Sequence, residues 1–166
     1  VGFGRIARCV ATRAAAFGLR LVAYDPYVAR EIGDKFNTKL VSLDELLETS
    51  DIISCHLPLM EETFHFFDSA KFRKMKKKPM FINTSRGKVV DTKALYEALK
   101  EGLLKCAGLD VLENEPPSFQ ESIFELGNVI ITPHVGFYSK EALLEVRKRS
   151  AQNITKFLQE TRLGEV

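Results

Sequence analysis

Three ionisable side chains follow three apolar runs of the sequence, and their types suit redox chemistry on a small acid. Arg86, Glu115 and His134 each come shortly after such a run. An arginine can hold a substrate carboxylate with two parallel hydrogen bonds and polarise a neighbouring carbonyl. A histidine titrates near neutral pH and can exchange a proton with a hydroxyl. Glu115 could orient that imidazole and raise its pKa.

Each of these residues also has an ordinary interpretation. Arg86 could belong to a surface ion pair, Glu115 could simply precede the Pro-Pro turn, and His134 could cap a helix. Taken singly, the ordinary interpretation is favoured in every case. Their joint occurrence after three successive apolar runs favours a common site.

A glycine-rich loop opens the chain. Residues 2–7 read GFGRIA, which matches the phosphate-binding pattern G-x-G-x-x-G/A. Gly2 would allow the tight turn, Gly4 would let the backbone approach a pyrophosphate, and a small residue at position 7 would let the helix pack closely. A helix beginning near Arg5 and Ile6 would present unpaired amides and a positive dipole end to that pyrophosphate. The pattern alone is weak, but a helix and then a strand are predicted to follow it.

Asp25 stands at the end of that strand, where an acidic residue accepts hydrogen bonds from the adenosine ribose of a dinucleotide. It also precedes Pro26, so a turn residue is the alternative. With the glycine loop in place we favour the ribose role, and a carboxylate there would repel a 2′-phosphate. The expected cofactor is therefore NAD rather than NADP.

The elements that must position these residues alternate along the chain. Continuous apolar runs of the kind seen in buried parallel strands lie at 19–24, 51–57, 79–83, 105–111 and 128–132. Helical patterns lie at 5–17, 43–48, 61–67, 69–75, 92–101 and 139–161. The alternation predicts an α/β fold, a Rossmann-type doubly wound parallel sheet, with ligands bound at the carboxyl ends of its strands.

Composition excludes several classes. The chain has 166 residues, 45% of them hydrophobic and 28% charged, with a net charge of +2. This is a globular composition, and the charge is too balanced to suggest a nucleic-acid partner. No run approaches the roughly 20 apolar residues of a membrane span. The three cysteines are far apart and are expected to be reduced core residues, which indicates a cytoplasmic protein.

The chain resembles the NAD-binding domain of the D-isomer-specific 2-hydroxyacid dehydrogenases, of the phosphoglycerate dehydrogenase type. The resemblance rests on GFGRIA, YDP, HLPL, NTSRGKVVD, GLDVLENEPP and TPHVG, which occur in the family's order over nearly the whole chain. It implies that Arg86, Glu115 and His134 are catalytic, with His134 passing a proton to the 2-oxo group as hydride leaves NADH. It implies a cofactor site that comprises Gly2, Gly4, Arg5, Ile6, Asp25, His56, Pro58, Thr84, Ser85, Asp110, His134 and Gly136. Asp110 would lie near the nicotinamide carboxamide.

Two residues depart from the family's pattern. Met60 stands where a threonine is frequent and Phe64 where an arginine is common. Both lie in the loop that the resemblance places by the cofactor, so a polar contact there could be lost. His56 and His65 are not expected to bind a metal, because no further ligand falls at a suitable spacing. The basic run at 71–78 is expected to be a solvated helix end.

Two other functions remain open from the sequence. An NADH-sensing corepressor of the C-terminal-binding-protein type would keep the same three ionisable residues. A bare Rossmann domain of another enzyme, such as a methyltransferase, would give no reason for those residues. The resemblance leaves the particular 2-hydroxy or 2-oxo acid unspecified.

The resemblance also carries expectations about the whole protein. Residues 1–166 would form a single cofactor domain whose first strand is largely missing, with the substrate domain absent, so that the chain alone would be inactive. A homodimer is expected, and the aromatic residues Phe64, Phe66, Phe67 and Phe72 suggest an exposed apolar interface. No nucleic-acid or membrane partner is expected.

Overall fold

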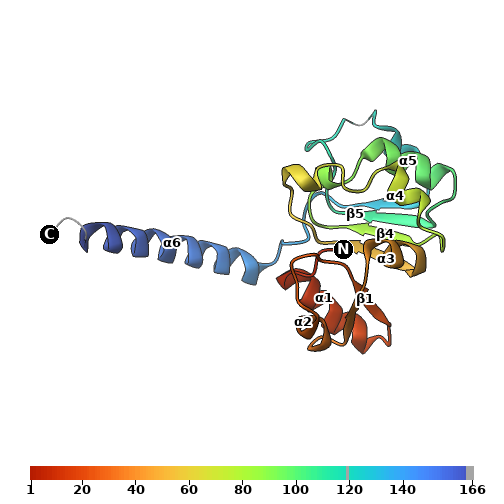
Figure 1. The fold of residues 1–166 in the computed structure, drawn as a ribbon. Coiled ribbons are helices and arrows are strands. Elements are labelled where there is room, and N and C mark those ends of the chain that lie inside the picture. The colour runs from red at the N-terminus through yellow and green to blue at the C-terminus, as the bar shows by residue number, and fades with distance from the viewer. Residues whose placement is uncertain (119, 164–166) are drawn as a thin grey trace. The chain divides into compact units, whose positions relative to one another are not determined.

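The computed structural model describes residues 1–118 and 120–163, and it divides into two compact units, Val1–Pro133 and His134–Val166. The first unit contains every strand of the described residues and is an α/β structure (Figure 1). The second contains the helix α6 (Lys140–Leu163).

Two parallel sheets make up the framework of the first unit. Strands β3 (Ile52–Cys55), β4 (Met80–Asn83), β5 (Cys106–Leu109) and β6 (Val129–Ile131) lie side by side in that order. Strands β1 (Leu21–Ala23) and β2 (Thr38–Leu40) form the other sheet. The five predicted strands are confirmed, each within its predicted run. The carboxyl ends of β3 to β6 therefore lie along one edge, as the parallel register requires.

Val1 and Gly2 lie between the two sheets. The Val1 nitrogen donates to the Ser54 carbonyl at 2.8 Å, and the His56 nitrogen donates to the Val1 carbonyl at 2.8 Å. This is the hydrogen-bond pattern of a parallel strand opposite Cys55. On the other side, the Gly2 nitrogen donates to the Tyr24 carbonyl at 2.9 Å. The two residues thus pair with both sheets in the manner of a parallel strand, and a cavity of about 500 Å³ lies beside them between β1 and β3.

Within its described residues, the first unit also has five helices and short 3₁₀ turns. Figure 1 shows α4 and α5 over one face of the four-stranded sheet and α3 against the other. Ser42, Asp68 and Asp91 cap α3, α4 and α5 by accepting a backbone N–H in each case. The bounds are α1 (Arg5–Ala16), α2 (Arg30–Asp34), α3 (Leu43–Thr49), α4 (Ser69–Arg73), α5 (Thr92–Lys100), η1 (Glu61–Thr63), η2 (Gly87–Val89) and η3 (Ser122–Glu125).

The expected aromatic interface is wrong for two of its four members. Phe67 and Phe72 are 0% and 1% exposed and pack on Phe81, with ring centroids 4.9 and 5.5 Å from its own. They are core residues because α4 and the segment before it cover the sheet at this point. Phe66 is half-buried, and Phe64 alone is well exposed. Phe67 and Phe72 therefore fill the core and are not available to an interface.

Three further expectations need correction. The helix predicted at 61–67 is a single 3₁₀ turn, after which Phe67 pairs in parallel with Val90. The short elements α2 and β2 have no counterpart in the predicted set. Of the cysteines, only Cys55 is buried, since Cys9 is exposed on α1 and Cys106 is half-buried.

The basic run at 71–78 is a set of exposed ion pairs. Lys74, Lys76 and Lys77 pair with Asp44, Glu48 and Asp51, which lie on α3 or just after it, at 2.7 to 3.2 Å. Exposed pairs of this kind contribute little to stability, about 0–1 kcal/mol each. Their positive charge is nevertheless matched locally, which agrees with a solvated surface.

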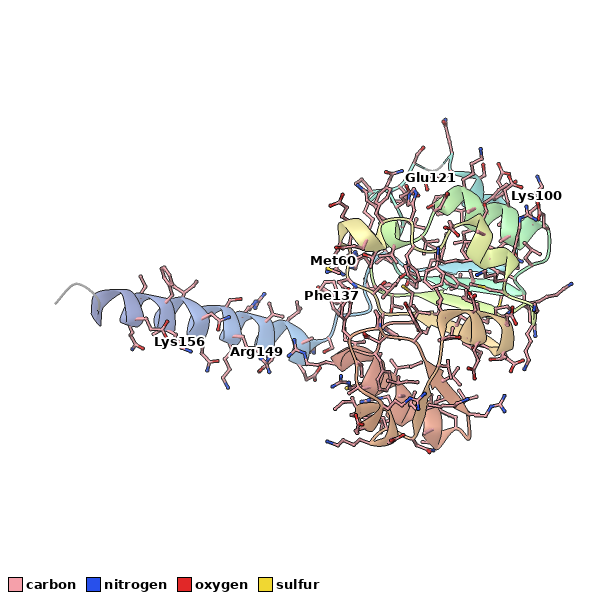
Figure 2. All side chains as sticks on the ribbon, in the orientation of Figure 1. Met60, Lys100, Glu121, Phe137, Arg149 and Lys156 are labelled. Atoms are coloured by element: carbon pink, nitrogen blue, oxygen red, sulfur yellow. The ribbon has the colours of Figure 1, made fainter. Side chains whose placement is uncertain are left out.

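Helix α6 confirms the predicted helix at 139–161. Figure 2 shows Arg149 and Lys156 projecting from this helix. Ion pairs link residues four apart, Arg149 with Glu145 at 2.6 Å and Lys156 with Glu160 at 3.7 Å. Among the described residues, no helix is long and apolar enough to cross a membrane.

Candidate cofactor and active site

The glycine loop has the backbone that the sequence predicts. Gly2 adopts a φ of 80°, and a Cβ there would lie 2.9 Å from the His56 carbonyl oxygen. Glycine is therefore required at this position both by conformation and by space. Ala7 is 6% exposed, and its small side chain lets α1 pack closely against the sheet of β1 and β2.

The start of α1 fits a pyrophosphate. Gly4 is its N-cap residue, and a Cβ at Gly4 would meet no atom of the described residues within 4 Å. A ligand could therefore approach this backbone closely. Arg5 and Ile6 follow in the exposed first turn, which contains no acidic residue to repel an anion. The amides of this turn are the kind of group that binds phosphate at a helix N-terminus.

Asp25 holds the glycine loop and the turn after β1 together. Its Oδ2 atom accepts the Phe3 amide at 2.8 Å, and its Oδ1 atom accepts the Tyr27 amide at 2.9 Å. The turn role is thus real. It is compatible with ribose binding, because an ionised carboxylate has about four acceptor positions and these bonds use two.

His56 follows β3 at the carboxyl edge of the sheet. Its Nε2 atom lies 3.0 Å from the Ser54 hydroxyl. Burial is the main cause that lowers the pKa of His56 to about 4, so the ring is neutral at pH 7. Pro58 comes next at the same edge, and its carbonyl accepts the Thr63 hydroxyl at 2.6 Å, which closes the loop.

A buried asparagine shapes the loop that carries Arg86. The Asn83 side chain is at the end of β4, with the residue 1% exposed. Its amide donates to the Arg86 carbonyl at 3.0 Å, and its oxygen accepts both the amide and the hydroxyl of Ser85. Thr84 and Arg86 are exposed, so this turn presents Arg86 beyond the sheet edge.

Asp110 and Glu115 follow β5 at the same edge. The Asp110 amide donates to the Asn83 carbonyl at 2.9 Å, continuing the ladder between β4 and β5. Its carboxylate is buried and accepts the Thr132 hydroxyl at 2.6 Å, from the residue after β6. The Oε1 atom of Glu115 accepts the Leu112 amide at 3.0 Å. The structure therefore brings the Arg86 and Glu115 loops to neighbouring strand ends, as predicted.

His134 is the first residue of the second unit. Its φ is 55°, a left-handed conformation that few non-glycine residues adopt. Its ring lies 6.2 Å from that of Phe137, edge to face. Gly136 belongs to this same short stretch before α6.

Several residues of the site region escape sequence reasoning. Gly87 is one, since a Cβ there would lie 1.8 Å from the Leu112 carbonyl oxygen, so the Arg86 loop touches the Glu115 loop backbone to backbone. His65 and Glu113 are others, joined by a 2.8 Å contact across 48 residues of sequence. Asn83 carried a signal, because a polar residue closing an apolar run is unusual in a buried strand. The His65–Glu113 contact left no such signal in the sequence.

Comparison with known proteins identifies the class of domain to which this chain belongs. Residues 1–136 match the family described as D-isomer specific 2-hydroxyacid dehydrogenase, NAD binding domain. The chain is therefore an NAD-binding domain, with the glycine loop and strand order described above. It belongs to the D-isomer specific 2-hydroxyacid dehydrogenase family.

Relatives and solved structures agree with that membership. Glyoxylate reductase of Korarchaeum cryptofilum is 43% identical over 157 residues, which cover 95% of this chain and 47% of the relative. D-3-phosphoglycerate dehydrogenase of Archaeoglobus fulgidus is 41% identical over 154 residues, covering 93% and 29%. The Aquifex aeolicus D-lactate dehydrogenase complexed with NAD and lactic acid matches with a TM-score of 0.86 at 38% identity, covering 96% and 52%. The chain thus spans about half or less of the length of these relatives.

Proposed function

We propose that this chain is the cofactor domain of an enzyme that transfers a hydride between NAD(H) and a D-2-hydroxy or 2-oxo acid. The observation that carries the proposal is the placement of Arg86 and Glu115 after the adjacent strands β4 and β5, in the unit that also holds the glycine loop. Ligands of parallel sheets bind at this edge. Family membership supports the same reaction class.

The chain's own residues would hold the cofactor along this edge. The amides at Gly2, Gly4, Arg5 and Ile6 would bind the pyrophosphate, and Asp25 would accept the adenosine ribose hydroxyls. His56, Pro58, Thr84, Ser85, Asp110 and Gly136 would line the remainder of the cofactor site. Bound NADH would supply the hydride.

Arg86, Glu115 and His134 would carry the remaining chemistry. The Arg86 guanidinium would hold the substrate carboxylate through a two-point contact and polarise the adjoining carbonyl. His134 would donate a proton to the 2-oxo oxygen in reduction and remove it in oxidation. Glu115 would orient the His134 imidazole and favour its charged form. A carboxylate clamp beside a proton donor selects 2-oxo acids over simple aldehydes or ketones.

The test is turnover of the full-length protein. Oxidation of NADH would be followed by absorbance with glyoxylate, pyruvate, hydroxypyruvate and bulkier 2-oxo acids, and with an aldehyde that lacks the carboxylate. We expect turnover with at least one 2-oxo acid and none with the aldehyde. Tight NADH binding without turnover on any acid would instead favour the corepressor function. The relatives named above, which are reductases and dehydrogenases, favour the enzyme.

The whole protein is further proposed to be a cytoplasmic homodimer. Three reduced cysteines support the compartment, and the resemblance to the family supports the dimer. Light scattering of the full-length protein at micromolar concentration measures the second point directly. A monomeric mass would contradict it.

A further inference from the structure

Three segments that are distant in the sequence meet beside Arg86 and Glu115. The segment 65–67 runs alongside 88–91, with the His65 amide donating to the Lys88 carbonyl at 2.8 Å and the Phe67 amide donating to the Val89 carbonyl at 3.0 Å. The third segment, 110–115, contacts the Arg86 loop through the close approach of Gly87 to Leu112. Arg86 lies two residues before the second segment, and Glu115 ends the third.

One side-chain pair ties the three segments together. The Nε2 atom of His65 lies 2.8 Å from Oε1 of Glu113, and Oε2 of Glu113 accepts the Thr92 amide at 3.1 Å. An ionised carboxylate has no proton to donate, so the imidazole must donate from Nε2. Glu113 therefore bridges the first turn of α5 and the loop after β3, two residues from Glu115.

The environment of the pair favours this bond. The side chains of His65 and Glu113 are 31% and 25% exposed, so water competes with them only in part. Phe64 stacks on the His65 ring, with centroids 4.0 Å apart and an angle of 17° between the planes. Burial by itself raises the pKa of Glu113, but hydrogen bonds from His65 and Thr92 outweigh it and the net pKa lies below the usual value.

The backbone of His65 indicates that its place is specified. Its φ is 48°, in the left-handed region where non-glycine residues are uncommon and asparagine, aspartate and histidine are enriched. A glycine would satisfy that conformation at no steric cost. A histidine there adds a side chain that reaches Glu113, at some conformational expense.

We propose that His65 and Glu113 are positioning residues that fix the Arg86 and Glu115 loops relative to one another for turnover. The assignment rests on the proposed reductase function. It predicts that breaking the pair misplaces the substrate contacts, while the glycine loop and Asp25, which would hold the pyrophosphate and the adenosine ribose, stay in place. The glycine loop and Asp25 are held by β1, the start of α1 and the end of β3, outside the three segments that the pair ties.

The experiment measures kcat, KM for the best 2-oxo acid and the Kd of NADH in the full-length protein. His65→Asn tolerates the left-handed backbone but is too short to reach Glu113. We expect kcat/KM to fall about 10- to 100-fold, because small misplacements of reacting groups have effects of that order. We expect the Kd of NADH to change by less than about threefold.

Two further variants make the result specific. Glu113→Gln keeps an amide oxygen that can accept a hydrogen bond from one partner, so kcat/KM should fall less in this variant than in His65→Asn. In the double variant kcat/KM should fall no further than in His65→Asn, because the two residues act through one contact. Lys74→Ala breaks a matched interelement pair on the surface, with Asp44 at 2.7 Å, and should leave all three constants unchanged.

The possible outcomes distinguish a failure of the positioning role from a failure of the proposed function. An active wild type with His65→Asn and Glu113→Gln within about twofold of it would overturn the positioning role. A parallel loss of NADH affinity would also overturn it, as a general loosening of the domain. A wild type inactive on every 2-oxo acid would overturn the proposed function, and the assignment with it. Should His65→Asn not fold, Glu113→Gln decides the question by the same constants.

Discussion

Asp25 shows how one carboxylate can serve both the chain and a ligand. Its two oxygens already bind the Phe3 and Tyr27 amides, and these bonds set the shape of the glycine loop. Removing the side chain would therefore disturb the loop as well as the ribose contact. Replacing it by asparagine keeps one acceptor and removes the charge, which isolates the electrostatic role.

Cofactor preference follows from that charge. Like charges about 4 Å apart repel by roughly 1–4 kcal/mol, so NADH should bind roughly 5- to 1000-fold more tightly than NADPH. Asp25→Asn should narrow the ratio of the two dissociation constants, measured by fluorescence titration. Asp44→Asn, a change to an acidic residue on α3, is the control and should leave the ratio as it is. Equal affinity of the unaltered protein for both cofactors would contradict the ribose role.

His134 is the residue whose loss should affect chemistry most. General acid–base catalysis contributes about 10²–10⁴-fold, so His134→Ala in the full-length protein should lower kcat by that order. NADH binding should survive, because the glycine loop and Asp25 are unchanged. The measurement is steady-state turnover across the pH range together with a NADH titration. Near-normal turnover at every pH would show that another group transfers the proton.

At the scale of elements, the close approach of two loop backbones restricts residue 87 to glycine. The Arg86 loop and the Glu115 loop meet where a Cβ on Gly87 would lie 1.8 Å from a carbonyl oxygen. Gly87→Ala must displace one loop, so we expect a loss of about 1–3 kcal/mol in the free energy of unfolding. A fall in kcat/KM should accompany it. Gly108→Ala on β5 is the matched control, since a Cβ there meets open space among the described residues.

The elements with a clear periodic signal were predictable, and the short ones were not. Continuous apolar runs identified β3 to β6, although alternate residues of these strands, among them Ile52 and Ile130, are exposed in the structure. Strand β2 contains the polar residues Thr38 and Lys39, so its three residues give no such run. The segment 61–67 has helical spacing, yet Phe67 is drawn into pairing with Val90 by tertiary contact.

For the site, sequence located residues but not their mutual contacts. Arg86 and Glu115 were predicted to share an edge because parallel strands end together. The burial of Phe67 and Phe72 was not predictable, because an aromatic run has the same sequence pattern in a core as at an interface. The His65–Glu113 contact depends on the fold of three loops, and no local pattern in a single sequence encodes it.

At the scale of the whole molecule, this chain corresponds to a part of its relatives. The match to Korarchaeum glyoxylate reductase covers 95% of this chain but only 47% of that protein. We therefore expect residues 1–166 alone to bind NADH and to lack turnover with any 2-oxo acid, because catalysis needs a closed, water-excluding site. Calorimetry measures the binding of NADH, and an NADH oxidation assay measures turnover. Turnover equal to that of the full-length protein would show that Val1–Val166 is sufficient.

The narrow bridge formed by Val1 and Gly2 has a consequence for native-state motion. Backbone bonds from these two residues connect the sheet of β1 and β2 with that of β3 to β6, beside a cavity of about 500 Å³. Proteins open locally along such poorly packed seams at a lower free energy than global unfolding. In hydrogen exchange of the 166-residue chain, amides of β1 and β2 should lose protection in one step, at least about tenfold faster than those of β4 and β5. Uniform protection across both sheets would mean that the bridge couples them into a single cooperative unit.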